Sequence, residues 1–265
     1  TFTPSKSILN LLSNNEVSEY LNNYKPNSII HLASYGISRK ENNDRVINKR
    51  NLLMIKNIIK YLPENCRLLV TGSMAEYGGS GIFKESDNCY PITEYAKSKL
   101  EITNYCLQEI EKGRDIRLCR IFGAYGYGEK GNRLFPSLYK SYKFKKTCQL
   151  SDGLQKRDFI HVFDICKCLK EIIILPKEKC RKIINIGTGE AVSIKYVVNK
   201  YVDSFGISPS LINFNSIPRS PGDANLLCSN VSNLRKLINF VPPQRLKENE
   251  NIKFLFSKNV YKILN

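Results

Sequence analysis

Short apolar runs that alternate with long amphipathic segments constrain the fold of this chain more than any other feature. Three of these runs end in small residues, as buried strands of a parallel sheet often do, and the segments between them carry apolar residues at helical spacing. Parallel strands need a crossover connection, usually a helix, so the alternation predicts an α/β fold with a parallel sheet. The expected strands are 27–34, 66–73 and, within 115–126, a third strand that runs into a glycine-rich loop. The expected helices between them are 45–62 and 91–111.

Beyond residue 126 the pattern changes to shorter elements. We expect a helix at 132–144, a strand and a helix within 157–175, a strand at 182–189, a helix at 192–206, and a strand and a helix within 218–243. In open α/β sheets, ligands bind at the carboxyl ends of the strands. The loops expected to form the site are 32–44, 71–90, 121–132 and 187–191.

Composition narrows the class of protein. The chain has 265 residues, of which 42% are apolar, as in globular proteins with one large domain or two small ones. No apolar run approaches the ~20 residues needed to span a bilayer, and the first residues lack the pattern of a secretory signal, so we expect a cytoplasmic protein without a membrane partner. The nine cysteines include no Cys-x-x-Cys pair, which favours reduced thiols over a metal site.

The net charge of +17 raises the question of a nucleic-acid partner. No block of Lys and Arg exceeds three residues, and Lys and Asn are frequent along the whole chain. The same charge would suit an anionic small substrate. Nucleic acid is therefore the disfavoured partner.

Tyr95 and Lys99 lie one helical turn apart in the helix expected at 91–111. A phenol has a pKa of about 10 in water, which is too high for a base at neutral pH. A cation one turn away favours the phenolate, so Lys99 would help Tyr95 to accept a proton. The alternative is an ordinary pair on a helix surface.

Seven motifs in one order carry a family resemblance: "IIHLAS", "VTGSMAEYG", "PITEYAKSK", "RIFGAYG", "GLQKRDFIHVFDI", "NIGTGEAVSI" and "PRSPGD". Together they resemble the extended branch of the short-chain dehydrogenase/reductase superfamily, the NAD-dependent epimerase/dehydratase group that acts on nucleotide sugars. The resemblance runs from about residue 16 to residue 243. It implies a Rossmann-like parallel sheet with a smaller, interleaved C-terminal substrate region. The implied ranges are 1–130 with 150–186 for the dinucleotide-binding part, and 131–149 with 187–265 for the substrate-binding part.

The resemblance implies roles for individual residues near the cofactor. Tyr95 would be the acid/base, and Lys99 would bind the nicotinamide ribose and tune Tyr95. Ser73 would orient the reacting sugar oxygen, although a plain turn serine is the alternative. Ala33 and Ser34 would line the cofactor through backbone contacts, together with Tyr95 and Lys99.

On the substrate side, the resemblance assigns Arg157 and Arg219 to a diphosphate and Asp223 to a nucleoside ribose. Arginine suits phosphate because its planar fork donates two parallel hydrogen bonds. The alternatives are a surface charge or a structural ion pair. His31 and His161 are expected to be packed structural histidines.

The implied cofactor is NAD or NADP, the implied substrate is a nucleotide-linked hexose, and the implied assembly is a homodimer. Epimerisation at C4 and reduction of a 4-keto sugar both need only hydride transfer with Tyr95, so both reactions stay open. Met74 and Ala75 stand where sugar 4,6-dehydratases carry Asp-Glu, and they cannot transfer protons, which disfavours dehydration. Gly123 stands where many relatives have an asparagine that contacts the substrate, which leaves the sugar contacts open.

The segment before residue 27 contains no glycine. Dinucleotide-binding folds open with a strand and a glycine-rich turn that places the pyrophosphate at a helix N-terminus. We therefore expect either an N-terminally incomplete form of a longer enzyme or a natively short protein. The short form would be a non-catalytic or degenerate paralogue that binds sugar nucleotides.

Overall fold

The computed structural model describes residues 1–38, 40–129, 133–180, 182–220, 222–248 and 251–257. The chain forms two compact units, each assembled from three segments. The first unit comprises Thr1–Glu76, Pro91–Arg120 and Ile173–Ile184, and the second comprises Tyr77–Tyr90, Ile121–Ile172 and Asn185–Asn265. Within the described ranges, no helix is both long and apolar enough to cross a membrane.

A four-stranded sheet of order β1-β2-β4-β9 forms the centre of the first unit. β1 (Ser28–His31) runs parallel to β2 (Arg67–Ser73), with His31 opposite Val70. The sheet is completed by β4 (Ile116–Ile121) and β9 (Ile183–Ile186). The middle of β2 is fully buried, which explains why this strand shows a continuous apolar run rather than alternation.

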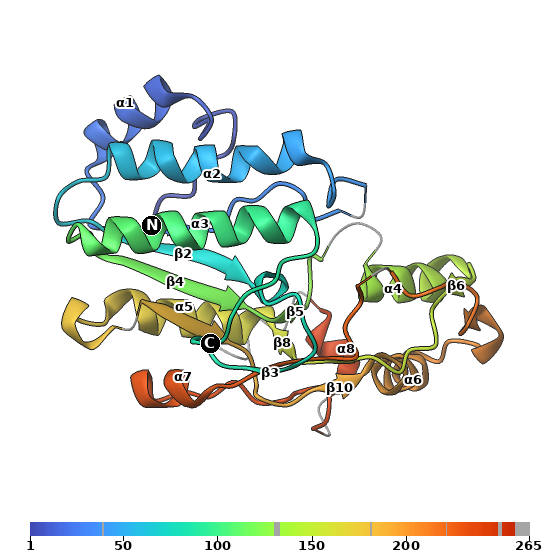
Figure 1. Cartoon of the computed structure of the whole chain (residues 1–265). Coiled ribbons are helices and arrows are strands. Elements are labelled where there is room, and N and C mark those ends of the chain that lie inside the picture. Colours follow the sequence, from blue (N-terminus) through green and yellow to red (C-terminus); the bar gives the residue numbers. More distant parts are fainter. Residues whose placement is uncertain (39, 130–132, 181, 221, 249–250, 258–265) are drawn as a thin grey trace. The chain divides into compact units, whose positions relative to one another are not determined.

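Two long helices, α2 (Arg45–Lys60) and α3 (Glu94–Glu111), cover one face of this sheet (Figure 1). Each helix has an N-cap side chain that accepts a hydrogen bond from a backbone N–H of the first turn. The N-cap is Asp44 in α2 and Thr93 in α3. Their inner faces pack on the strands in one apolar cluster that includes Ile55, Ile58, Ile59, Leu68, Val70, Ile102, Cys106 and Leu118. The helix α1 (Asn14–Tyr24), which the sequence patterns did not predict, lies beyond α2.

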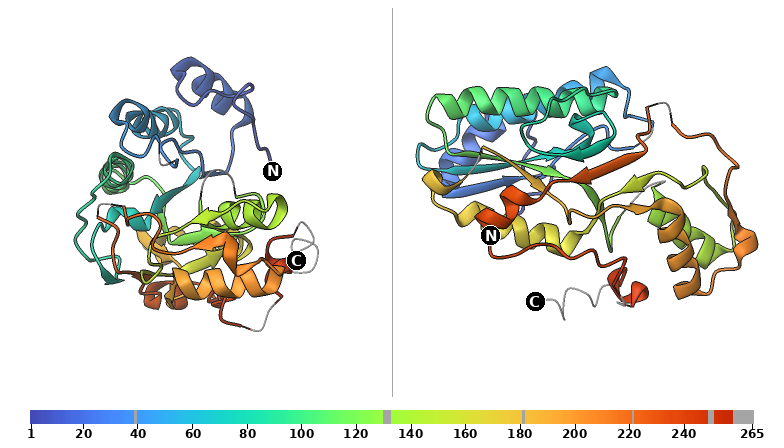
Figure 2. Two further views of the ribbon diagram at one scale, coloured as in Figure 1. Left: turned by 90° about the vertical axis from the view of Figure 1, so that its right-hand side faces the viewer. Right: turned by 60° about the horizontal axis from the view of Figure 1, so that its bottom comes forward.

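The second unit contains short strands and five helices among its described residues. Its strand pairs are β5 (Gly123–Tyr125) with β8 (Phe159–His161), β12 (Leu226–Ser229) with β3 (Gly81–Phe83) and β7 (Lys156–Arg157), β10 (Val192–Ser193) with β7, and β11 (Ile212–Asn213) with β6 (Cys148–Gln149). All but the β10–β7 pair are parallel. The helices are α4 (Leu134–Phe144), α5 (Val162–Ile174), whose last two residues belong to the first unit, α6 (Ile194–Phe205), α7 (Ser232–Leu237) and α8 (Ile252–Leu255). In both views of Figure 2, α4 and α6 lie side by side.

The predicted α/β fold with a parallel sheet is confirmed. Residues 115–126, expected to be a strand that runs into a glycine-rich loop, form two strands instead, because the chain changes partner within this segment. The N–H of Phe122 still bonds the carbonyl of Ile186, whereas the N–H of Gly123 bonds the carbonyl of Asp158. A Cβ at Gly123 would lie 2.8 Å from that Asp158 oxygen, so the close approach requires glycine. Residues 39 and 130–132, in two of the predicted site loops, lie outside the described ranges.

Candidate active site

β2 ends at Ser73, where the chain turns into the short 3₁₀ helix η1 (Met74–Glu76). The hydroxyl oxygen of Ser73 accepts a hydrogen bond of 3.2 Å from the backbone N–H of Ala75. The serine side chain therefore keeps its own proton for an acceptor outside this turn. Since Ser73 is only partly buried, that acceptor can come from solvent or from a ligand.

Tyr95 lies in the first turn of α3, and Lys99 lies one turn further along. Lys99 is only 3% exposed, and its Nζ donates a hydrogen bond of 2.9 Å to the carbonyl oxygen of Thr71 in β2. The same Nζ lies 5.9 Å from the centre of the Tyr95 ring, which is partly buried. Because Thr71 is two residues before Ser73, the structure brings all three predicted catalytic residues to the carboxyl end of β2.

Burial controls the charge of this site. It lowers the pKa of Lys99 to about 8, and the nearby carboxylate of Glu76 opposes this lowering. Burial also lowers the pKa of His31 to about 3, with a smaller contribution from the charge of Lys99. His31 is therefore neutral at pH 7, as expected for a packed structural histidine, and Lys99 is mostly protonated.

Ala33 and Ser34 follow β1 at the same edge of the sheet. His31 and Val70 are the last paired residues of β1 and β2. Ser34 and Ser73 each lie three residues further along, so both serines are at this edge of the sheet. An ammonium group has three donors, and the hydrogen bond to Thr71 uses one of those of Lys99. These features fit the nicotinamide and ribose end of a dinucleotide. Residues 1–31 contain no glycine, so the described chain before the end of β1 offers no glycine-rich turn for the pyrophosphate.

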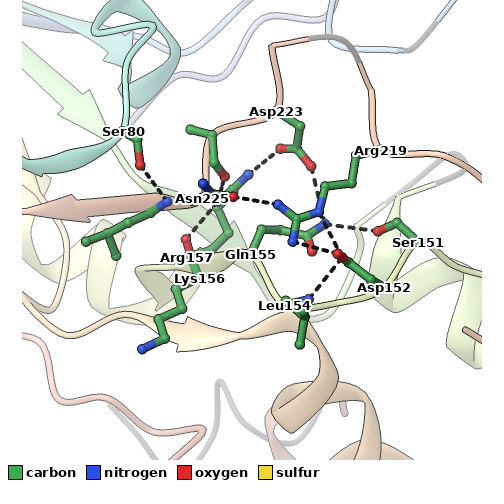
Figure 3. Close-up of polar contacts among 12 residues, drawn as sticks. Ser80, Ser151, Asp152, Leu154, Gln155, Lys156, Arg157, Arg219, Asp223 and Asn225 are labelled. Carbon is green, nitrogen blue, oxygen red and sulfur yellow. Dashed lines mark hydrogen bonds and ion pairs between the residues drawn. The ribbon is translucent and has the colours of Figure 1, made fainter. Parts of the chain in front are cut away.

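A cluster of paired charges in the second unit contains the predicted substrate residues (Figure 3). Arg219 donates from Nε and Nη2 to the carboxylate of Asp152, both at 2.8 Å, and from Nη1 to Asn225 Oδ1 at 2.7 Å. A guanidinium has five N–H donors, so these three bonds leave one hydrogen on each terminal nitrogen. Arg219 is thus held in place with two donors to spare. A hollow of about 340 Å³ beside it is lined by Asp152, Asn215, Ser216, Ile217, Pro218 and Arg219.

Arg157 is held more tightly and is only 8% exposed. Its Nη1 donates to the carbonyl oxygens of Lys156 and Ala224, each at 2.8 Å, and its Nη2 pairs with Asp223. Gln155 also donates to Asp223, at 3.3 Å (Figure 3). Two of the predicted substrate residues, Arg157 and Asp223, are therefore paired with each other. Their predicted contacts with diphosphate and ribose remain predictions.

His161 is fully buried in the second unit. Its Nδ1 accepts from the backbone N–H of Phe163, so the proton sits on Nε2, which donates to the carbonyl of Leu255 at 2.9 Å. This is the packed structural histidine that the sequence predicts. Among the described residues, no group of three His, Cys, Asp or Glu side chains is arranged to hold a metal ion, and the nine cysteines are free thiols.

Four polar residues at these two sites were not singled out from the sequence: Glu76, Thr103, Asp152 and Asn225. Glu76 is fully buried beside Ser73, and Thr103 bonds it from α3. The spacing of Thr103 four residues after Lys99 puts both on one face of α3, which is a signal that could have found it. No comparable spacing marks Asp152, which lies 67 residues from its partner Arg219.

Comparison with known proteins places the chain in a family. The model of the NAD dependent epimerase/dehydratase family matches residues 6–187, well over half of the sequence. The chain belongs to this family. The predicted resemblance is confirmed, and so, at the level of the family, is a nicotinamide dinucleotide as the cofactor. The residues around Lys99 fit one end of such a cofactor.

Individual relatives of this epimerase/dehydratase chain are distant. The dTDP-6-deoxy-L-talose 4-dehydrogenase (NAD(P)(+)) of Kitasatospora kifunensis is 27% identical over 184 residues, which are 62% of this chain and 55% of that protein. An uncharacterized UDP-glucose epimerase of Bacillus subtilis (strain 168) is 24% identical over 212 residues, 77% of this chain and 66% of that protein. The chain thus spans less than two thirds of the length of either relative.

Solved structures share the fold of this family member. An epimerase from Methanothermobacter thermautotrophicus has a TM-score of 0.81 at 22% identity, over 96% of this chain and 78% of that one. This similarity confirms the predicted Rossmann-like architecture.

Proposed function

We propose that the protein is an NAD(P)-dependent enzyme that epimerises or reduces a nucleotide-linked hexose at C4. The observation that carries the proposal is the buried Lys99, bonded to Thr71 at the end of β2 and close to the Tyr95 ring. The names of two relatives support the substrate class, since one is a dTDP-6-deoxy-L-talose 4-dehydrogenase and the other is named as an uncharacterized UDP-glucose epimerase.

The proposed mechanism divides proton handling between three side chains. The ammonium of Lys99 stabilises the phenolate of Tyr95, which accepts the proton of the sugar hydroxyl. The Ser73 hydroxyl donates a hydrogen bond to the same sugar oxygen and holds it near Tyr95. A nicotinamide dinucleotide, when bound there, would supply the hydride acceptor or donor for the sugar carbon. In the reverse direction Tyr95 returns the proton, which is the step that reduction of a 4-keto sugar needs.

Dehydration is disfavoured by the turn after Ser73. Met74 and Ala75 cannot take or give protons, and the remaining member of η1, Glu76, is completely buried. The Glu76 carboxylate is engaged with the backbone of Ser73 and the side chains of Thr103 and Arg120. It is therefore shielded from a sugar. We propose a reaction without an elimination step.

For the substrate, we propose that Arg219 donates its two remaining N–H groups to the diphosphate. The argument is its orientation by Asp152 and Asn225, at the side of a hollow. Arg157 and Asp223 complete this region as a paired support. The assignment of residues 131–149 and 187–265 to substrate binding is part of the same proposal.

We also propose a cytoplasmic homodimer. Its support is the outer surface of α2, where two large apolar side chains, Val46 and Leu53, are 70% and 45% exposed. A contiguous apolar patch can mark a surface that a partner covers, and these two side chains are seven residues, about two helical turns, apart on α2. Size measurement in solution tests this part separately from activity.

The function is tested with purified protein, a panel of nucleotide sugars, and NAD or NADP. Replacing Tyr95 by Phe removes only the hydroxyl, so turnover should fall by orders of magnitude while binding of the nucleotide sugar stays nearly intact. Unchanged turnover in Y95F would rule out the assigned acid/base. Calorimetry that detects nucleotide-sugar binding but no NAD(P) binding would instead favour the non-catalytic paralogue.

A further inference from the structure

We propose that Glu76 is a positioning residue for the Ser73, Tyr95 and Lys99 set. Its buried carboxylate fixes the backbone at Ser73, ties that turn to α3, and supplies the negative charge that acts on Lys99. This inference rests on the proposed function of those three residues. Glu76 itself is 0% exposed and contacts no solvent, so it acts only through its neighbours.

The first contact concerns the turn that carries Ser73. Glu76 Oε1 accepts the backbone N–H of Ser73 at 2.8 Å, which closes the turn from β2 into η1. Gly72 makes this possible, because a Cβ there would lie 2.5 Å from Oε1 and 3.2 Å from the Arg120 side chain. The backbone conformation at Ser73, and with it the position of the Ser73 hydroxyl, therefore depends on the Glu76 carboxylate.

The second contact concerns the helix that carries Tyr95 and Lys99. Glu76 Oε2 accepts the hydroxyl of Thr103 at 2.8 Å. Thr103 lies one turn after Lys99, and Lys99 reaches Thr71 on the same strand end. Two successive turns of α3 are thus anchored to the segment from Thr71 to Glu76, and one of the anchors is Glu76.

The third contact concerns charge. Glu76 Oε2 also accepts from Nε of Arg120 at 2.8 Å, and both side chains are buried. The ionisable groups around Lys99 come from four elements: His31 of β1, Glu76 of η1, Tyr95 of α3 itself, and Arg120 of β4 behind Glu76. His31 is neutral and Arg120 is cationic, so Glu76 is the carboxylate in this set that favours the protonated lysine.

The test compares two variants that each remove one buried carboxylate. E76Q removes the proposed charge, and D164N removes the carboxylate of Asp164, which is equally buried and pairs with Arg245 in the second unit. Lys99 is titrated by NMR of ¹³C-labelled lysine side chains, with its signal assigned from K99M. We expect the Lys99 midpoint to move below the wild-type value in E76Q and to stay in place in D164N.

The titration separates positioning from general stability, because both variants should lose thermal stability. An unchanged Lys99 midpoint in E76Q, or an equal shift in D164N, would overturn the proposal. With a turned-over substrate, E76Q should lose kcat at neutral pH more than it raises KM. Failure of the proposed reaction would leave the NMR result intact, so the two proposals fail separately.

A milder pair of variants keeps the proposal testable where E76Q does not fold. T103V removes the hydroxyl that holds Glu76, whereas S98A removes a hydroxyl of α3 that bonds Tyr95 and Asn51 instead. Exchange of the Ser73 amide hydrogen with solvent should be several-fold faster in T103V and unchanged in S98A. Wild-type exchange at Ser73 in T103V would contradict the tie between Glu76 and α3.

Discussion

The Nζ of Lys99 lies 2.9 Å from the carbonyl oxygen of Thr71. This contact joins the helix of the predicted acid/base to the strand that ends in Ser73. It also fixes the position of a cation that would otherwise be a flexible side chain, and it does so where little water reaches the ammonium.

The burial of Lys99 should make stability depend on pH. Its pKa in the folded protein is about 8, below the ordinary 10.5, so the unfolded chain binds more protons between these values. Stability from this group should therefore rise with pH from about 8 to 10.5. At 1.36 kcal/mol for each pH unit, the full effect is about 3 kcal/mol. Denaturation of wild type and K99M across this range measures it, and a difference between them that is constant with pH would contradict it.

Lys99 should also determine how kcat falls at alkaline pH. If protonated Lys99 holds the Tyr95 phenolate, kcat should decline as pH rises above about 8, where the lysine loses its proton. The measurement is the pH profile of kcat for wild type and K99R. Arginine stays charged at these pH values, so any activity of K99R should lack this limb. A wild-type profile that is flat through pH 9 would be incompatible with the assigned role.

Replacing Ser73 by Ala should lower kcat about a hundredfold, the usual cost of one hydrogen-bond donor to a reacting oxygen. KM for the nucleotide sugar should change little, because the bond forms with the reacting oxygen rather than with the nucleotide. S73T keeps a hydroxyl and should retain more activity than S73A. Equal activity of wild type and S73A would show that Ser73 is a plain turn residue.

Arg219 and an exposed arginine of α7, Arg235, offer a matched pair of variants for testing the proposed diphosphate contact. R219M should weaken binding of a nucleoside diphosphate about tenfold or more, since hydrogen bonds to charged groups contribute about 1.5–3 kcal/mol. R235M removes the same charge elsewhere in the second unit and should bind as wild type does. Calorimetry with UDP, GDP and dTDP measures both. Equal weakening in the two variants would indicate a general charge effect.

Gly123 should tolerate no side chain. G123A places a Cβ 2.8 Å from the Asp158 carbonyl and 3.2 Å from the Phe159 ring, so we expect a loss of about 1–3 kcal/mol in the free energy of unfolding. G81A is the control, because its Cβ would meet only Phe83, at 3.8 Å. Denaturant unfolding compares them. Equal stability of G123A and G81A would mean that β5 and β8 can separate at little cost.

The sequence predicts the fold well where local patterns dominate. Continuous apolar runs and helical spacing locate β1, β2, α2 and α3 to within a few residues, because burial on a sheet requires those patterns. The partner change at Gly123 was not predicted, since it depends on which strand lies alongside rather than on residues nearby in the chain. The helix α1 was also missed, although Ser13 caps it and accepts from Glu16 N–H.

The residues of the candidate site were likewise predicted only where local spacing in the sequence marks them. Tyr95 and Lys99 were found because a single helical turn links them. Glu76, Asp152 and Asn225 were not found, because their contacts depend on the folded chain: Glu76 meets Arg120 across 44 residues, and Asp152 meets Arg219 across 67. The sequence did not predict that Arg157 pairs with Asp223, because a structural ion pair was only the alternative to a role in substrate binding.

The two compact units are interleaved along the chain, which passes from one to the other after residues 76, 90, 120, 172 and 184. Neither unit is therefore encoded by one continuous stretch of the gene. A chimera that exchanged the second unit of this protein for that of a relative would need a junction at each of these crossings. A property that belongs to one unit is therefore easier to alter by point substitution than by exchanging the whole unit.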